Sequence, residues 1–183
     1  MEQHKPLISP AKDWFKSRGW KPFPFQLNAW SAYLDGKHGL VNAPTGSGKT
    51  YSLVMPILLE FLHEKRKAKN NGLRVIWITP IKALAKEIAY SAGKAADGLG
   101  VDWQVAVRSG DTSTKERQRM KKTPPEFLIT TPESMQLMLA QKGYDKYFKN
   151  LRAVVCDEWH ELLGSKRGVQ MELALSRLKT IAP

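Results

Sequence analysis

The sequence predicts an α/β domain built on a mostly parallel sheet with helices on both faces. Short apolar segments rich in β-branched residues alternate with longer segments whose apolar residues recur at helical spacing. A glycine-rich stretch, "APTGSGKT" at 43–50, lies where the first short segment passes into a helical one. Such alternation is typical of βαβ units, in which ligands bind at the carboxyl ends of the strands.

Five short apolar segments are predicted to be the strands. They are 38–43, 73–80, 101–107, 126–130 and 151–157. The third segment alternates, which places Val101, Trp103 and Val105 on one face. The fifth ends in adjacent carboxylates, Asp157 and Glu158, which are therefore expected at the carboxyl edge of the sheet.

Four longer segments carry the helical pattern. They are 48–65, 81–96, 132–142 and 168–181. Thr131 is expected to cap the third helix, with Pro132 at its first position. Residues 1–36 are rich in aromatic residues and proline and are predicted to pack as a segment on one domain formed by 37–183.

The composition is that of an ordinary globular protein, with one cysteine and a strong positive charge. Hydrophobic residues make up 42%, and the lone Cys156 excludes an internal disulfide and favours a reducing compartment. No signal pattern opens the chain, and its longest apolar stretch is too short for a membrane span, so a cytoplasmic location is expected. The net charge is +12, and basic residues cluster at 64–74 and 115–122, both interpreted as loops. Clustered bases favour a polyanion such as nucleic acid, although many basic proteins bind nothing acidic.

The glycine-rich stretch has the pattern of a phosphate-binding loop. Gly46 and Gly48 tolerate positive φ, so several backbone N–H groups can converge on one anion at a helix N-terminus. Lys49 is placed to reach the β- and γ-phosphates of ATP, and the Thr50 hydroxyl is placed to bind Mg²⁺. The residues assigned to ATP here are Thr45, Gly46, Ser47, Gly48, Lys49 and Thr50.

The two carboxylates at the end of the last strand complete this chemistry. Asp157 is expected to hold Mg²⁺ through water, and Glu158 to orient and deprotonate the attacking water. The alternative is an exposed acidic pair at a strand end. A small kinase is disfavoured because it has no use for a water-activating carboxylate. A GTPase is disfavoured because no asparagine here is followed by lysine.

Six stretches in order resemble the motifs of superfamily-2 DExH-box helicases, from about Trp14 to Leu178. They are "GWKPFPFQ", "APTGSGKT", "TPIKALAKEI", "RSGDTS", "TTPES" and "DEWH". The sequences of the later motifs are most similar to those of the Lhr helicases. The tryptophan in "DEWH" and the "PFPFQ" form resemble their bacterial ligase-associated branch. The resemblance implies a RecA-like P-loop NTPase domain.

The resemblance also implies roles for single residues. Gln26 would read the adenine edge, and Trp20 or Phe23 would stack on the ring, unless both belong to the core. His160 would couple the nucleotide state to a later motif; the alternative is a histidine satisfied by a backbone carbonyl. Backbone contacts to a nucleic acid strand are expected from Pro80, Lys82, Gly110, Asp111, Thr131 and Ser134. For Thr131 and Ser134 a capping role is equally open, and for Gly110 and Asp111 a plain turn.

The function implied is the first RecA-like motor domain of an ATP-dependent DNA helicase or translocase that moves on single-stranded nucleic acid, with a link to DNA repair in the bacterial cytosol or nucleoid. Its partners would be single-stranded DNA or RNA, repair proteins, and a second RecA-like domain that supplies an arginine finger. Without that domain the chain is expected to bind Mg–ATP weakly and hydrolyse it poorly. The alternatives are an RNA helicase domain and a non-catalytic ATP-gated binding module, against which Glu158 argues.

Overall fold

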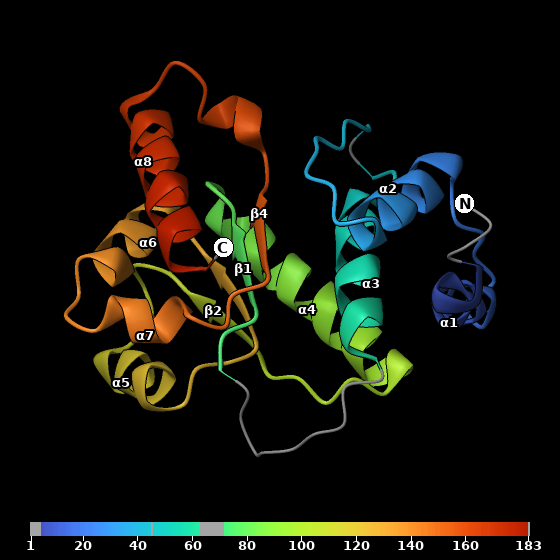
Figure 1. Ribbon diagram of the computed structural model, residues 1–183, viewed down its shortest axis with the longest axis horizontal. Helices are drawn as coiled ribbons and strands as arrows, with labels where there is room; N and C mark the ends of the chain where they lie inside the picture. The colour runs from blue at the N-terminus through green and yellow to red at the C-terminus, as the bar shows by residue number, and fades with distance from the viewer. Residues whose placement is uncertain (1–4, 45, 63–71, 183) are drawn as a thin grey trace. The chain divides into compact units, whose positions relative to one another are not determined.

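The computed structural model describes residues 5–44, 46–62 and 72–182 (Figure 1). Its elements are α1 (Lys5–Lys16), α2 (Pro24–Leu34), α3 (Lys49–Phe61), β1 (Val75–Ile78), α4 (Lys82–Leu99), β2 (Val105–Arg108), α5 (Thr114–Lys122), β3 (Phe127–Thr130), α6 (Pro132–Leu139), α7 (Tyr144–Phe148), β4 (Ala153–Cys156) and α8 (Lys166–Ile181). They form two compact units. The first contains α1 to α3 and residues 90–102, and the second contains β1, the start of α4 and everything from Trp103 onward.

The second unit is built on a parallel sheet, as the alternating pattern predicted. Its four strands lie in the order β2-β3-β1-β4, and every pairing is parallel. β1 and β3 are buried at all four positions, which is why their sequences "VIWI" and "FLIT" are apolar except at Thr130 instead of alternating. The buried Thr130 hydroxyl donates to the Arg108 carbonyl at 2.8 Å. The sheet therefore carries the carboxyl ends of its strands to one edge, where the later motifs follow.

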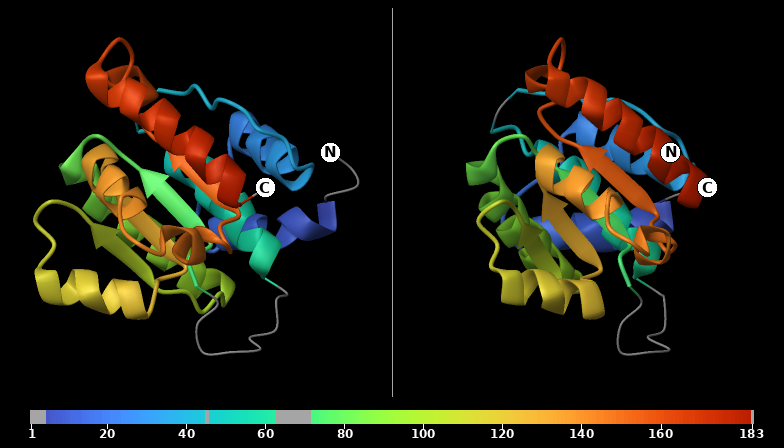
Figure 2. Two further views of the ribbon diagram at one scale, coloured as in Figure 1. Left: turned by 60° about the vertical axis from the view of Figure 1, so that its left-hand side comes forward. Right: turned by 90° about the vertical axis from the view of Figure 1, so that its left-hand side faces the viewer.

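One face of this sheet packs on α6 and α8, which lie side by side (Figure 2). Ile76, Ile78 and Leu128 point to this face because alternate strand residues share a side. Met135 of α6 and Met171 of α8 meet them, and all five side chains are fully buried. On the opposite face the rings of Trp77 and Phe127 stack with centroids 6.2 Å apart.

The first unit is a helical cluster held by aromatic side chains. α2 packs along α3, and the indole of Trp30, fully buried, donates its N–H to the Tyr51 carbonyl at 3.0 Å. Trp14 of α1 lies so close to Gly98 of α4 that a Cβ at position 98 would overlap its indole. Gly98 lies in the last turn of α4, and the lack of a side chain there makes room for the tryptophan.

Two sequence predictions about elements are wrong. Residues 38–43 lie outside any strand, and Leu40 is 83% exposed. A strand exists only through a hydrogen-bonded neighbour, and only Leu40, Val41 and Ala43 in this segment offer apolar surface for packing in a sheet. Residues 115–122 form α5 and not a loop. Ser113 and Glu116 make a capping box, in which the Glu116 N–H donates to the Ser113 hydroxyl at 3.2 Å. The other basic cluster, 64–74, lies outside the described residues up to 71.

Among the helices that the structure describes, none combines the length and the apolar character that crossing a bilayer requires.

Candidate functional site

The glycine loop has the backbone that its sequence predicts. Gly46 and Gly48 have φ of +79° and +80°, so both occupy the left-handed region that favours glycine. Gly48 caps the N-terminus of α3, which begins at Lys49, and the N–H of Ser47 donates to the Pro44 carbonyl at 3.3 Å. The expectation of two positive-φ glycines before a helix is confirmed. Thr45 lies outside the described residues.

Gln26 contacts this loop directly. Its amide Nε2 donates to the Gly48 carbonyl at 2.9 Å, and its Oε1 accepts the N–H of Phe23 at 2.8 Å, which closes the first turn of α2. The side chain is 2% exposed. The glutamine that the resemblance assigns to adenine is therefore also the group that ties the N-terminus of α2 to the end of the phosphate-binding loop.

The two aromatic candidates for stacking on a base differ in their surroundings. Trp20 is 45% exposed and lies against the rings of Trp14, Phe15 and Tyr51 at centroid distances of 6.0–6.1 Å. Phe23 is 54% exposed and lines an apolar concave surface of about 460 Å³. Lys21, Pro22, Pro24, Leu27 and Asn28 complete that surface, and Trp20 is not part of it. Phe23 stacks on Phe25 with ring centroids 6.0 Å apart and also lines the hollow, whereas Trp20 lies in a cluster of three other rings away from it.

The acidic pair follows β4 directly in the second unit. The Asp157 N–H donates to the Ile78 carbonyl at 2.8 Å and so extends the pairing of β4 with β1 by one residue. The carboxylate of Asp157 accepts two donors, the Trp77 indole N–H on Oδ2 at 3.3 Å and the Glu158 N–H on Oδ1 at 3.0 Å. These bonds orient the carboxylate at the carboxyl edge of the sheet.

Glu158 has an unusual backbone for its type. Its φ is +48°, and it is the only described residue other than glycine with a positive φ. Such a conformation costs free energy for an L-residue and clusters at functional sites. Its side chain is 19% exposed, and Oε2 lies 3.5 Å from Nδ1 of His160. The 68% exposed imidazole also lies 3.4 Å from Glu161 through Nε2, so both ring nitrogens of His160 face carboxylates.

Trp159 and Cys156 flank the acidic pair and pack against the core of the second unit as partly buried side chains. Burial raises the pKa of the Cys156 thiol to about 11.

The residues expected to hold a strand gather at the carboxyl edge of the second unit. Lys82, at the start of α4, forms an ion pair with Asp111 at 3.0 Å, and both side chains are exposed. Residues 109–112 form the predicted tight turn, in which the Ser109 N–H donates to the Thr112 hydroxyl at 2.9 Å. The Gly110 carbonyl accepts from Arg117 of α5 at 2.7 Å. Lys82 and the turn are thus brought together although 29 residues separate Lys82 from Asp111.

Thr131 and Ser134 are placed as capping residues. The Thr131 hydroxyl accepts the Ser134 N–H at 3.3 Å and caps α6. Their exposed fractions are 3% and 4%, so neither hydroxyl lies open on the surface. The prediction that they bind phosphate stays untested, and the capping role that was equally open is the one seen.

Sequence reasoning missed Arg167, in a basic segment to which it assigned no role. Its Nη2 donates to the Pro80 carbonyl at 3.3 Å, and its Nε donates to Glu133 at 2.6 Å. Partial burial would raise the pKa of Glu133, but hydrogen bonds from backbone N–H, Arg167 and Thr131 lower it overall. Arg167 thus joins the segment after β1 to the start of α6. The signal was the run "SKR", in which Ser165 caps α8 and the two basic residues begin it.

Each unit contains an oxygen donor of the kind that binds magnesium carried by a nucleotide. Among the described residues, no group of three or more His, Cys, Asp or Glu could hold a metal by itself. Mg²⁺ is commonly bound by one or two protein oxygens together with substrate phosphates and water. The Thr50 hydroxyl and the Asp157 carboxylate are donors of that kind; Thr50 belongs to the first unit and Asp157 to the second.

Comparison with known proteins identifies the chain. Residues 23–183 match the profile of the DEAD/DEAH box helicases. The chain is 34% identical to the Lhr helicase/uracil glycosylase of Escherichia coli over 96% of its length and 12% of that protein. It is 35% identical to the ATP-dependent helicase Lhr-Core of Methanocaldococcus jannaschii over 99% of its length and 23% of that protein.

A solved structure agrees with these relatives. The Mycobacterium smegmatis helicase Lhr bound to single-stranded DNA and AMP-PNP superposes with a TM-score of 0.86 at 33% identity, covering 98% of this chain and 24% of that one. The chain thus spans less than a quarter of the length of these proteins. The fold is RecA-like, and the resemblance to the Lhr helicases is confirmed; the narrower ligase-associated branch stays a prediction. The chain belongs to the DEAD/DEAH box helicase family.

Proposed function

We propose that this chain is the ATP-binding motor domain of an Lhr-type helicase that moves on single-stranded DNA. The observation that carries the proposal is the glycine loop, in which two left-handed glycines precede Lys49 at the start of α3, in a chain of this family. N–H groups at such a helix start attract phosphates, and Lys49 adds a positive charge there.

Asp157 and Glu158 have different roles in this proposal. Asp157 accepts hydrogen bonds on both oxygens and stays fixed, as a ligand of magnesium-bound water needs to be. Glu158 acts as the general base on the attacking water, and Lys49 and Thr50 hold the phosphates and the metal. Bound Mg²⁺ neutralises charge that develops on the phosphates. His160 is within reach of Glu158, which supports a role in coupling the nucleotide state to strand binding.

Phe23 is proposed as the residue that stacks on adenine, because it lines the apolar hollow beside Gln26 and Trp20 does not. Gln26 then exchanges one of its two hydrogen bonds for the adenine edge. The side chain is already positioned by α2, so little rotamer entropy remains to be lost on binding.

The strand is proposed to cross the carboxyl edge of the second unit at two ion pairs, Lys82–Asp111 and Arg167–Glu133. All four side chains are more than 40% exposed, so a phosphate can replace either carboxylate on its cation. These contacts are blind to base identity, as translocation requires. Pro80 and Gly110 contribute carbonyls that hold the two arginines, Arg167 and Arg117, in place.

DNA is preferred to RNA because the Lhr structure named above contains single-stranded DNA. The alternative is an RNA helicase domain. A link to DNA repair remains what the sequence resemblance implies.

The decisive experiment uses the full-length helicase of which we propose this chain to be a part. It measures ATP hydrolysis with single-stranded DNA and with RNA of the same sequence. We expect stimulation by DNA, loss of hydrolysis in Glu158→Gln with ATP binding retained, and loss of binding in Lys49→Ala. The magnitude expected for loss of the base is about 10²–10⁴-fold in kcat. Full hydrolysis by Glu158→Gln would refute the assigned base, and stronger stimulation by RNA would favour the alternative.

The 183-residue chain alone is expected to bind Mg–ATP and to hydrolyse it slowly, because an arginine finger from a second domain contributes about 10³–10⁵ in kcat in related phosphoryl-transfer enzymes. If the chain alone hydrolysed ATP as fast as the full-length helicase, this expectation of slow hydrolysis would be wrong.

A further inference from the structure

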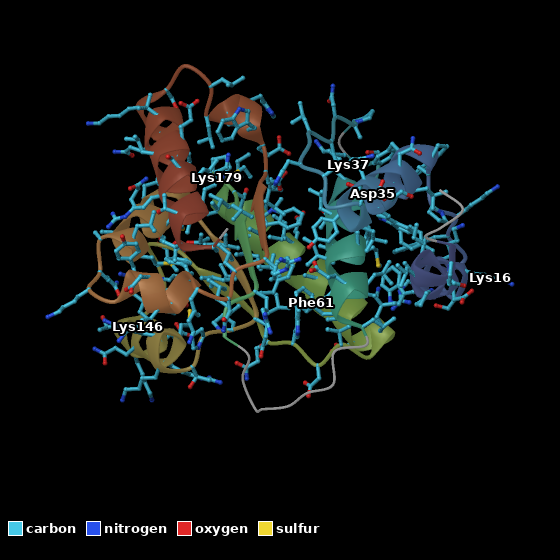
Figure 3. All side chains as sticks on the ribbon, in the orientation of Figure 1. Lys16, Asp35, Lys37, Phe61, Lys146 and Lys179 are labelled. Carbon is cyan, nitrogen blue, oxygen red and sulfur yellow. The ribbon has the colours of Figure 1, made fainter. Side chains whose placement is uncertain are left out.

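A basic pocket in the second unit is not accounted for by the proposed ATP site or strand path. It has a volume of about 250 Å³ and lies where the end of α5 meets the segment between α6 and α7. Its cationic lining residues come from four parts of the chain. They are Arg108, Lys121, Lys122, Lys142 and Lys146. Lys146 is labelled in Figure 3 beside α7.

Arg108 is the feature that makes this pocket more than a charged surface. It is 5% exposed, and its guanidinium has no carboxylate partner among the residues that the structure describes. Burial lowers the pKa of Arg108, and Arg117 nearby lowers it further, while Tyr147 raises it. A buried cation without a partner is costly, so a protein that keeps one usually provides for an anion.

Tyr147 adds a second unsatisfied group at the same place. Its hydroxyl is buried without a hydrogen-bond partner, and its side chain lines the pocket with Arg108. Burial raises the pKa of Tyr147 to about 12, so the phenol remains a neutral O–H donor at every physiological pH. A buried hydroxyl without an acceptor and the guanidinium of a residue that is 5% exposed thus line one cavity.

The lysines have a structural role as well, which must be weighed. Lys121 and Lys122 lie in the last turn of α5, where positive charge offsets the helix dipole. Lys146 lies in the last turn of the short helix α7 and can have the same role. That role does not explain Arg108, which comes from a strand, or Lys142, which lies between α6 and α7. Among the described residues, no Asp or Glu lines the pocket.

We propose that this pocket binds a phosphate of a nucleic-acid backbone, outside the strand path at the carboxyl edge. A volume of about 250 Å³ is below the roughly 300–1,000 Å³ that enclose drug-sized ligands, so it accepts a phosphate group and not a whole nucleotide. Five cations exceed the charge of one phosphate, which favours a polymer whose neighbouring phosphates meet the exposed lysines. A guanidinium matches phosphate in a two-point contact, and lysines add point charges.

The position of the pocket separates it from the proposed strand path. Pro124 of its lining precedes β3, and Lys121 and Lys122 end a helix that begins after the turn at 109–112. Residues of the strand path instead follow the carboxyl ends of β1, β2 and β3. Arg108 links the two regions, because its backbone adjoins that turn and its side chain lines the pocket.

The test uses the 183-residue chain labelled with ¹⁵N and the double variant Lys142→Gln/Lys146→Gln. Both lysines are exposed, so the variant is expected to fold normally. The control Lys16→Gln/Lys179→Gln removes the same charge from exposed sites in α1 and α8 (Figure 3). We expect a single-stranded oligonucleotide to shift the Gly143 amide and the Arg108 Nε–H signals in the parent chain and the control. In the pocket variant the slope of log K against log salt concentration should be smaller in magnitude by about 1.4, because two phosphate contacts at about 0.7 each are lost.

Three results would overturn the proposal. The first is saturation by the oligonucleotide without any shift at Gly143 or Arg108. The second is an equal shift with inorganic phosphate at the same phosphate concentration, which identifies the ligand as a free anion. The third is an equal shift with polyglutamate, which identifies an acidic protein segment. ATP binding by the pocket variant serves as the separate readout of the proposed function, and it stays unchanged whichever way the pocket behaves.

Discussion

Gly46 and Gly48 allow the architecture of the phosphate-binding loop to be tested with a matched pair of substitutions. Their φ values are +79° and +80°, so alanine at either position meets the same left-handed backbone and costs about 1–2 kcal/mol. Their surroundings differ. A Cβ at position 46 has nothing within 4 Å, whereas one at position 48 lies 2.9 Å from Nε2 of Gln26.

The extra cost of Gly48→Ala follows from the state of Gln26. The glutamine is 2% exposed and held at both ends, so its amide cannot yield without losing the bond to the Gly48 carbonyl. Loss of a hydrogen bond that leaves a buried polar group unsatisfied costs about 1–3 kcal/mol. Gly48→Ala is therefore expected to destabilise by about 1–3 kcal/mol more than Gly46→Ala, which corresponds to a further fall in Tm of about 2–12 °C for a chain of this size.

Thermal melts followed by circular dichroism measure both effects, and a Gln26→Ala background isolates the contact. With the glutamine shortened, Gly48→Ala should cost the same as Gly46→Ala, because only the backbone strain remains. Equal melting temperatures for the two single variants would refute the reasoning. So would an extra cost at position 48 that survives the removal of Gln26.

Four further predictions concern other side chains described above. Phe23→Ala should weaken ATP binding about tenfold and leave stability intact, since base–aromatic stacking contributes about 1–3 kcal/mol. Trp20→Ala should lower Tm and leave ATP affinity intact. Isothermal titration and thermal melts measure both quantities, and weaker ATP binding by the Trp20 variant alone would contradict this assignment. Glu158→Gly should raise the free energy of unfolding by about 1 kcal/mol by relieving the positive φ, while abolishing hydrolysis; an unchanged urea midpoint would contradict it. Ser113→Ala should cost about 1 kcal/mol in urea unfolding through the lost cap of α5, and a neutral result would mean that α5 needs no cap. The pKa of Glu133 is lowered on folding, so its contribution to stability is present above its ordinary value of 4.5 and is lost as pH falls through the folded value; Glu133→Gln should flatten that acid-side loss in pH-dependent melts, and an unaltered slope would exclude it.

Patterns that depend on near neighbours in the chain were predictable from the sequence. The parallel sheet follows from apolar runs separated by helical repeats, and the two left-handed glycines follow from a motif whose geometry only glycine supplies. The turn at 109–112 was equally predictable, because its hydrogen bond joins residues only three positions apart. The capping box of Ser113 and Glu116 was also present in the sequence, but the density of charge in 115–122 was interpreted as a loop.

Features set by distant contacts were not predictable. The segment at 38–43 has the composition of a strand, yet strand formation depends on a partner elsewhere in the chain. Arg167 gained its position from Pro80 and Glu133, which lie 87 and 34 residues away. The positive φ of Glu158 leaves no mark in residue type, because glutamate gives no hint of a left-handed backbone.

The hydrogen bond from the Trp77 indole to Asp157 allows the binding of a cation there to be followed by tryptophan fluorescence. An indole whose N–H is held by a carboxylate changes its emission when that carboxylate acquires a cation, because the local electric field on the ring changes. Trp77 is 1% exposed, so bulk solvent contributes little to its signal. Subtracting the spectrum of Trp77→Phe from that of the unsubstituted chain would therefore report the binding of a cation at Asp157 without any attached dye.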